Sequence, residues 1–192
     1  GLVRASEQER LDVGFDAEYS GNDLMSLARL RAKNANLLTA LDIMDWGYSP
    51  TEWQRNTIPD LYKPKSSVIF DGIDTEFITP DAAARFTLPD GRSVAAGDEV
   101  LTFINRNLEP YRGFHIFMRA LPAIQKARPD CITLIVGGEQ VSYGARPKHA
   151  ASWKEAMLRE MGDELDLSRI VFLGNIPYPA YRQLLRVSRA HA

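Results

Sequence analysis

The sequence of 192 residues has little of several things that would define its chemistry at once. It contains a single cysteine, Cys131, which excludes an internal disulfide. Its three histidines show no metal-ligand spacing with acidic or cysteine partners, so we expect no metal site. It also lacks a basic excess: 23 lysines and arginines face 25 aspartates and glutamates, and the formal charge is −2. That balance gives no electrostatic case for a nucleic-acid partner.

Long apolar runs are absent as well. No stretch approaches the roughly 18 residues that a membrane-spanning helix needs, and the polar first 14 residues lack the apolar core of a signal peptide. Cys131 stands at the start of an apolar strand, where we interpret it as an inert core thiol of a reducing compartment. We therefore expect a cytoplasmic protein without a transmembrane segment.

The first half of the chain carries local signals for short elements. Apolar residues at helical spacing predict a helix from Asn22 or Asp23, with Asn22 as its cap. A short strand is expected at 46–49 and a helix at 51–58, whose capping box would start at Ser49. We expect a buried strand at 66–70 and a turn at 71–74. One side of the first helix should face a core through Leu27, Leu30, Leu37, Leu38, Leu41 and Met44.

The segment around Asp90-Gly91 gives the strongest hairpin signal, because this turn sequence separates two short extended runs. We expect a small surface hairpin in a connector between two α/β units. After residue 98, strands alternate with helices, and this order predicts a parallel, doubly wound α/β sheet. Pro122 should kink or split the first of these helices. The strands are expected at 100–105, 131–136 and 169–173, and the helices at 110–127, 152–161 and 179–190.

Two arginines follow the first strand of this alternating region. The carboxyl ends of parallel strands are where such sheets bind nucleotides, and Arg106 and Arg112 lie in the loop that leaves this strand. Two guanidinium groups can hold a diphosphate and stabilise its charge as it leaves. An equally good interpretation from physics alone is that these arginines pair with Glu109 or face solvent.

Two further loops follow the next strands. Gly137-Gly138 permits close approach of a backbone, although a plain tight turn explains it as well. Asn175, Ile176 and Tyr178 could offer backbone groups and an apolar face to a base, while an ordinary strand-to-helix loop is the simpler interpretation. The sequence shows no P-loop, no G-x-G-x-x-G fingerprint and no Ser-His-Asp or Cys-His arrangement.

Taken in order, these segments resemble the glycosyltransferase group 1 family, retaining enzymes with the two-domain, Rossmann-like GT-B fold. The residues that carry the resemblance are VIFDGIDTEFITP at 68–80, TFINRNLEPYRGFHIFMRALPAI at 102–124, LIVGG at 134–138 and VFLGNIP at 171–177. The resemblance implies three parts: residues 1–80 as the end of the N-terminal, acceptor-side domain with the hinge, 81–98 as a connector, and 99–192 as the first part of the donor domain. Both domains would be incomplete.

The resemblance also implies roles for single residues. Arg106 matches the family's phosphate-binding arginine, and Arg112 stands where a lysine is usual, followed by Gly113 as the expected glycine. Arginine keeps the charge there but offers a planar fork in place of a point charge. Gly138 matches the glycine after the second strand. Asn175, Ile176 and Tyr178 lie in the region that packs on the nucleotide base.

The function implied is transfer of a sugar, of the hexosyl type, from a nucleotide-diphosphate sugar to an acceptor with retention of configuration. The donor is a substrate, and no cofactor or metal is expected; the acceptor would be a glycan, a lipid or a small molecule. The family's paired-glutamate segment would follow residue 192 and its acceptor-side histidine would precede residue 1, so we expect this chain alone to be inactive. A nucleotide-sugar epimerase of the same fold and a non-catalytic nucleotide-binding module are the alternatives.

Overall fold

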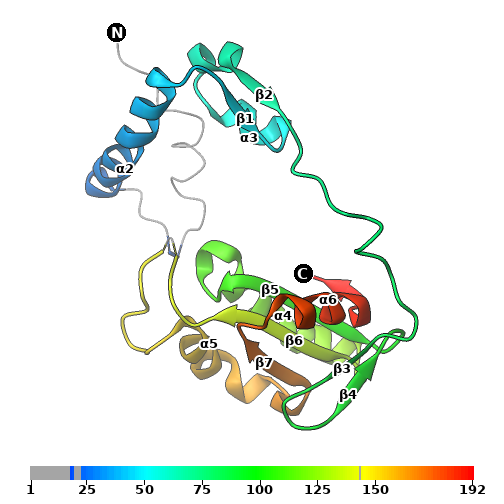
Figure 1. Cartoon of the computed structure of the whole chain (residues 1–192). Helices are drawn as coiled ribbons and strands as arrows, with labels where there is room; N and C mark the ends of the chain where they lie inside the picture. Colours follow the sequence, from blue (N-terminus) through cyan, green and yellow to red (C-terminus); the bar gives the residue numbers. More distant parts are fainter. Residues whose placement is uncertain (1–17, 20–22, 143) are drawn as a thin grey trace. The chain divides into compact units, whose positions relative to one another are not determined.

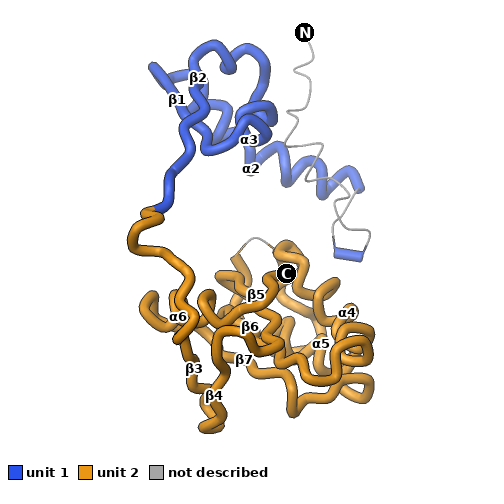
Figure 2. The backbone as a smooth tube through the Cα atoms, turned by 90° about the vertical axis from the view of Figure 1, so that its right-hand side faces the viewer, with its two compact units in different colours: residues 1–73 blue, residues 74–192 orange. Residues whose placement is uncertain are grey.

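The computed structural model describes residues 18, 19, 23–142 and 144–192. The chain divides into two compact units, residues 1–73 and 74–192, which are coloured separately in Figure 2. Asn22, the expected helix cap, lies outside the described residues.

The first unit contains a long helix followed by short elements. Strands β1 and β2 pair in parallel, with Tyr48 opposite Ser67. In chain order the described elements are α2 (Leu24–Ile43), β1 (Gly47–Ser49), α3 (Glu52–Thr57), the 3₁₀ helix η1 (Asp60–Lys65) and β2 (Ser66–Val68).

Helix α2 forms where its spacing predicts it, and most of its apolar side is at least partly buried. The Asp23 side chain accepts hydrogen bonds from the backbone N–H groups of Met25 and Ser26, and this cap sets the start of the helix. Of the six apolar residues expected to face a core, Leu41 is buried, whereas Leu37 is 50% exposed. Leu27, Leu30, Leu38 and Met44 are partly buried, so the prediction of a core-facing side is confirmed except at Leu37.

Two local predictions in this unit are also corrected. The cap of α3 is Thr51, two residues after the expected Ser49: its side chain accepts from the Gln54 N–H at 3.1 Å and donates to the Gln54 carbonyl oxygen Oε1. Two hydrogen bonds of the Thr51 hydroxyl, one to the backbone and one to the side chain of Gln54, thus cap the start of the helix. The expected buried strand at 66–70 stops at Val68, and Phe70 is 68% exposed.

The second unit is an α/β domain around a parallel sheet. The strands lie side by side in the order β7-β6-β5-β8, all parallel (Figure 1). The described elements are β3 (Arg85–Thr87), β4 (Ser93–Ala95), β5 (Val100–Asn107), η2 (Pro110–Arg112), α4 (Phe114–Ala127), β6 (Ile132–Gly138), α5 (Trp153–Met161), η3 (Gly162–Glu164), η4 (Leu167–Arg169), β7 (Ile170–Gly174), α6 (Tyr178–Val187) and β8 (Ala190–His191). The predicted doubly wound sheet is confirmed, and β8 adds a further parallel strand beside β5.

Alternate side chains of the strands point to two faces, and each face has its own cover. On one face Phe103 stacks on Phe117 of α4, with ring centroids 4.4 Å apart, and α5 packs beside α4. On the other face Leu134 and Val136 pack with Leu184 of α6. Apolar strands covered on both faces are what parallel sheets require.

The β3–β4 hairpin forms around Asp90-Gly91 as predicted, but its place differs from the expected one. Leu88 and Val94 are each 2% exposed and belong to the same core cluster as α6. The hairpin thus packs on the sheet together with α6 and is not a separate surface element, because its apolar side chains belong to the same core as those of α6.

Helix α4 runs without a break from Phe114 to Ala127 through Pro122, so it is not split there. Proline removes the hydrogen bond to the Met118 carbonyl. Met118 and Leu121 are fully buried, and their packing holds the helix on the sheet.

Candidate functional site at the carboxyl end of β5

The order of the strands marks one place in the second unit as the natural ligand site. The chain passes from β5 to β6 and β7 on one side, and then returns to place β8 on the other side of β5. The connection that leaves β5 goes to β6 on one side, and the connection from β7 through α6 enters β8 on the other side. Open α/β sheets bind their ligands in the crevice at such a switch point. The segment 106–113, which begins with the last two residues of β5, lies at this edge, so Arg106 belongs to the strand and not, as expected, to the loop after it.

Arg106 is exposed near the end of β5. Among the residues that the structure describes, its guanidinium group makes no hydrogen bond and no ion pair. A fixed strand therefore presents a planar cation with its donors still available for an anionic ligand.

Arg112 lies at the end of η2 and is exposed as well. The next residue, Gly113, has φ of 72°, a left-handed conformation that glycine adopts without strain. This residue turns the chain from η2 into α4. The N-terminus of α4, with its positive end of the helix dipole, follows the two arginines directly.

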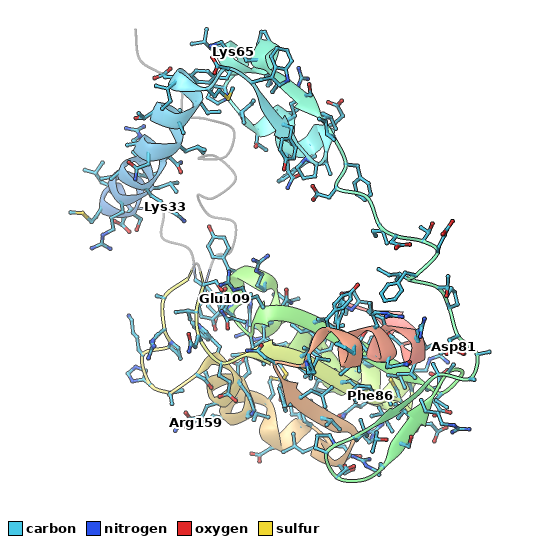
Figure 3. The ribbon with its side chains drawn as sticks, in the orientation of Figure 1. Lys33, Lys65, Asp81, Phe86, Glu109 and Arg159 are labelled. Atoms are coloured by element: carbon cyan, nitrogen blue, oxygen red, sulfur yellow. The ribbon has the colours of Figure 1, made fainter. Side chains whose placement is uncertain are left out.

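The interpretation in which the arginines are neutralised by Glu109 has to take account of where Glu109 lies. Its side chain is fully buried, and its carboxylate oxygen Oε2 accepts hydrogen bonds from the backbone N–H groups of Ser142 and Gly144, at 3.0 and 3.3 Å (Figure 3). Glu109 therefore ties down the loop after β6. Sequence reasoning considered Glu109 only as a partner of the arginines and missed this role, although a carboxylate between the apolar Leu108 and Pro110 signals burial.

Gly137 and Gly138 are required by close packing at the end of β6. A Cβ atom at Gly137 would lie 2.8 Å from Leu108 Cδ2 and 2.9 Å from the Asn105 carbonyl oxygen. At Gly138 it would lie 2.6 Å from Asn107 Oδ1. The backbone of β6 thus passes directly against the segment that carries Arg106, which is a stronger reason for glycine than a tight turn.

The predicted residues after β7 lie in different settings. Asn175 is exposed, and its Nδ2 would be 3.3 Å from a Cβ on Gly138, so it stands near the end of β6. Ile176 is partly buried and packs against the core cluster shared with α6. Tyr178 begins α6, is 55% exposed and has its ring centroid 6.2 Å from that of Tyr181.

The loop from 139 to 152 is held at its far end by polar contacts. Glu139 accepts hydrogen bonds from Lys154 Nζ at 2.8 Å and from Ser152 Oγ at 2.9 Å. The Lys154 ammonium group foremost, and then Ser152, hold the pKa of the Glu139 carboxyl below its usual range. The ammonium group also lies 4.9 Å from the centroid of the Phe172 ring.

A hollow beside the start of α5 is lined by residues of this same polar cluster. Its charged side chains pair with one another, Glu139 with Lys154 and Glu155 with Arg159. No residue of the predicted site lines it. We therefore assign it no ligand.

Two other kinds of feature are absent from the described residues. No helix there is long and apolar enough to cross a membrane. Within the same ranges, no group of three or more histidine, cysteine, aspartate or glutamate residues is arranged to hold a metal ion.

Comparison with known proteins agrees with this architecture. Residues 6–78 match the family described as "Glycosyl transferase family 4 group". The crystal structure of TarM has a TM-score of 0.50 and 14% sequence identity, with 93% of this chain covered. A TarM variant from S. aureus, in complex with fondaparinux, alpha-GlcNAc-glycerol and UDP, has a TM-score of 0.48 and 14% identity over 90% of this chain.

The chain spans 28% and 29% of the lengths of these two structures. No curated protein sequence matches it. At this level of identity the first TarM structure speaks for the fold alone, and the fold it supports is the expected α/β, Rossmann-like arrangement. The family match covers residues 6–78, less than half of the chain, and the likeness to TarM over 93% of the chain supports the expected Rossmann-like, GT-B type of fold.

Proposed function

We propose that the second unit binds the diphosphate of a nucleotide-diphosphate sugar, and that the protein transfers the sugar, a hexose, to an acceptor with retention of configuration. The observation that carries the proposal is Arg106: an exposed guanidinium without a protein partner among the described residues, at the carboxyl end of β5 and beside the switch point of the sheet. The family match supports the type of reaction.

The proposed chemistry is electrostatic. When the bond between the sugar and the diphosphate breaks, negative charge builds up on the leaving phosphate oxygens. Arg106 would donate to these oxygens as a fork, and Arg112 and the first N–H groups of α4 would add positive potential. In this mechanism the arginines replace a metal ion as the neutralising charge.

We place the nucleotide base toward the end of β7, near Asn175, Ile176 and Tyr178. Support comes from the position of these residues after a neighbouring parallel strand, with Asn175 next to Gly138. The acceptor, proposed as a glycan, a lipid or a small molecule, would meet the first unit. A cytoplasmic location is proposed because Cys131 is a buried, unpaired thiol.

Calorimetric titration of the 192-residue chain with UDP, GDP and ADP tests the proposal. At least one diphosphate should bind, and Arg106→Ala should weaken it about 10- to 150-fold, the equivalent of losing a hydrogen bond to a charged group worth about 1.5–3 kcal/mol. Arg112→Ala should weaken it in the same direction.

Arg85→Ala is the matched control. Arg85 is also an exposed arginine of the second unit, but it lies on the hairpin strand β3, and its loss should leave the affinity unchanged. If no diphosphate binds, or if Arg85→Ala weakens binding as much as Arg106→Ala, the proposed donor site is wrong. Binding without turnover in the chain would be expected; turnover with a panel of nucleotide sugars would show that the chain needs no further segment.

A further inference from the structure

Three consecutive residues after Arg106 bond to the last residue of β6 or to the segment that follows it. Asn107 Nδ2 donates to Ser142 Oγ at 2.6 Å, the Leu108 N–H donates to the Gly138 carbonyl at 2.9 Å, and Glu109 accepts from the backbone of Ser142. The segment that carries the two arginines and the start of the next loop are therefore joined side by side.

Glu109 is the centre of this junction. Its carboxylate is fully buried and takes two backbone N–H groups, from Ser142 and Gly144. A buried carboxylate is costly unless hydrogen bonds satisfy it, and N–H groups directed at an ionised carboxylate make strong, directional bonds. An apolar side chain of the same size would fill the space but would leave both N–H groups without an acceptor.

We propose that Glu109 is a positioning residue for the diphosphate site. It fixes Ser142 and Gly144 against the segment 106–113, so that a nucleoside diphosphate meets a site with two preformed walls. This inference rests on the proposed function, because it concerns the same site. A ligand that must first order a loop loses affinity to that ordering, and a clamp that acts before binding removes this cost.

The state of the loop can be measured without any ligand. Lys148 is exposed in the loop, and trypsin cleaves after it, whereas Arg146 precedes a proline and resists. Glu109→Gln should increase the rate of cleavage after Lys148. Glu164→Gln is the matched control, because Glu164 is an exposed carboxylate of the same unit and makes the same change of charge.

A spectroscopic signal reports on the same loop. The indole N–H of Trp153 donates to the Ala145 carbonyl at 3.0 Å. In a Trp46→Phe, Trp53→Phe background, Trp153 is the remaining tryptophan, and its emission should shift in Glu109→Gln and not in Glu164→Gln.

The affinity experiment separates positioning from a general loss of structure. The diphosphate that binds best and its monophosphate are titrated against wild type, Glu109→Gln and Glu164→Gln. Glu109→Gln should weaken the diphosphate about tenfold, as coupled sites typically do, and should reduce the ratio of diphosphate to monophosphate affinity. Destabilisation alone would not change this ratio in a protein that is still folded.

A milder variant covers the case in which Glu109→Gln does not fold. Ser142→Ala removes the hydrogen bond from Asn107 alone, and it should change the cleavage rate and the affinity ratio in the same direction by a smaller factor. If Glu109→Gln binds the diphosphate with wild-type affinity, the inference is overturned. If Glu109→Gln does not fold, wild-type affinity of Ser142→Ala for the diphosphate overturns it instead. If wild type binds no diphosphate, the proposed function fails and the positioning role falls with it, while cleavage after Lys148 still shows whether the clamp exists.

Discussion

Alanine substitutions of Gly137 and Gly138, the last two residues of β6, should destabilise the second unit by different amounts. The new Cβ atom would meet a backbone carbonyl at position 137 and a movable side chain at position 138. A Cβ atom at position 137 would lie 2.9 Å from the carbonyl oxygen of Asn105, in the backbone of β5, and 2.8 Å from Leu108 Cδ2. The carbonyl cannot give way without moving the strand, and φ at Gly137 is +156°, a conformation that an L side chain rarely adopts. We therefore expect Gly137→Ala to destabilise the second unit by about 2–3 kcal/mol, the upper part of the range for overpacking.

The neighbouring substitution should cost less. At position 138 the new atom would lie 2.6 Å from Asn107 Oδ1, which is the end of a side chain. Asn107 can rotate away, and the loss is then its hydrogen bond to Ser142, a net contribution of about 1 kcal/mol. Gly138→Ala should thus reduce stability by about 1 kcal/mol.

Urea unfolding followed by Trp153 emission, in the background with phenylalanine at positions 46 and 53, measures both. Gly162→Ala is the control, because a Cβ there meets nothing within 4 Å and its φ is −57°; this change should be neutral or slightly stabilising. Equal losses in the free energy of unfolding for Gly137→Ala and Gly138→Ala would refute this prediction. A loss for Gly162→Ala as large as either would refute it as well.

Three smaller predictions concern other parts of the second unit. Burial raises the pKa of the Cys131 thiol, so iodoacetamide at pH 8 should alkylate the native chain far more slowly than the urea-unfolded chain, as mass spectrometry would show; equal rates would contradict this. Lys154 foremost lowers the pKa of Glu139, so the ionised carboxylate stabilises the fold above its unfolded-state pKa, and this stabilisation is lost as the pH falls through the lower folded-state pKa. Because the pair is half-exposed, the contribution is below about 1 kcal/mol. The pH dependence of the free energy of unfolding should lose this contribution on the acid side in Glu139→Gln. The Arg182 guanidinium lies 3.6 Å from the centroid of the Phe77 ring, so Arg182→Ala should speed chymotrypsin cleavage after Phe77, and an unchanged rate would show that this contact does not hold the segment.

Regular patterns made most of the second unit predictable from the sequence. Apolar strands such as Ile132–Gly138 and the spaced core residues of α4 depend on short-range periodicity, and both were confirmed. The burial of the hairpin and the exposure of Leu37 were not predictable, because they depend on which distant element covers an apolar side.

The candidate site divides in the same way. The placement of Arg106 at the carboxyl end of β5 follows from local sequence, and the family resemblance singled out its position. Glu109 and Asn107 contact residues more than 30 positions away, and these contacts could not be predicted from local sequence. Nothing in the local pattern identifies the partner of a polar side chain across a sheet edge. Only the fold joins these segments.

The central claim, that a nucleoside diphosphate binds at the carboxyl end of β5, is tested most directly by locating the bound ligand. Two-dimensional NMR of the ¹⁵N-labelled chain, titrated with UDP, GDP and ADP, reports the position of binding residue by residue. The account predicts that the largest amide shifts fall in 106–114 and at Gly138, and that they vanish in Arg106→Ala but persist in Arg85→Ala. Shifts confined to other parts of the chain, or no shifts with any of the three, would contradict it.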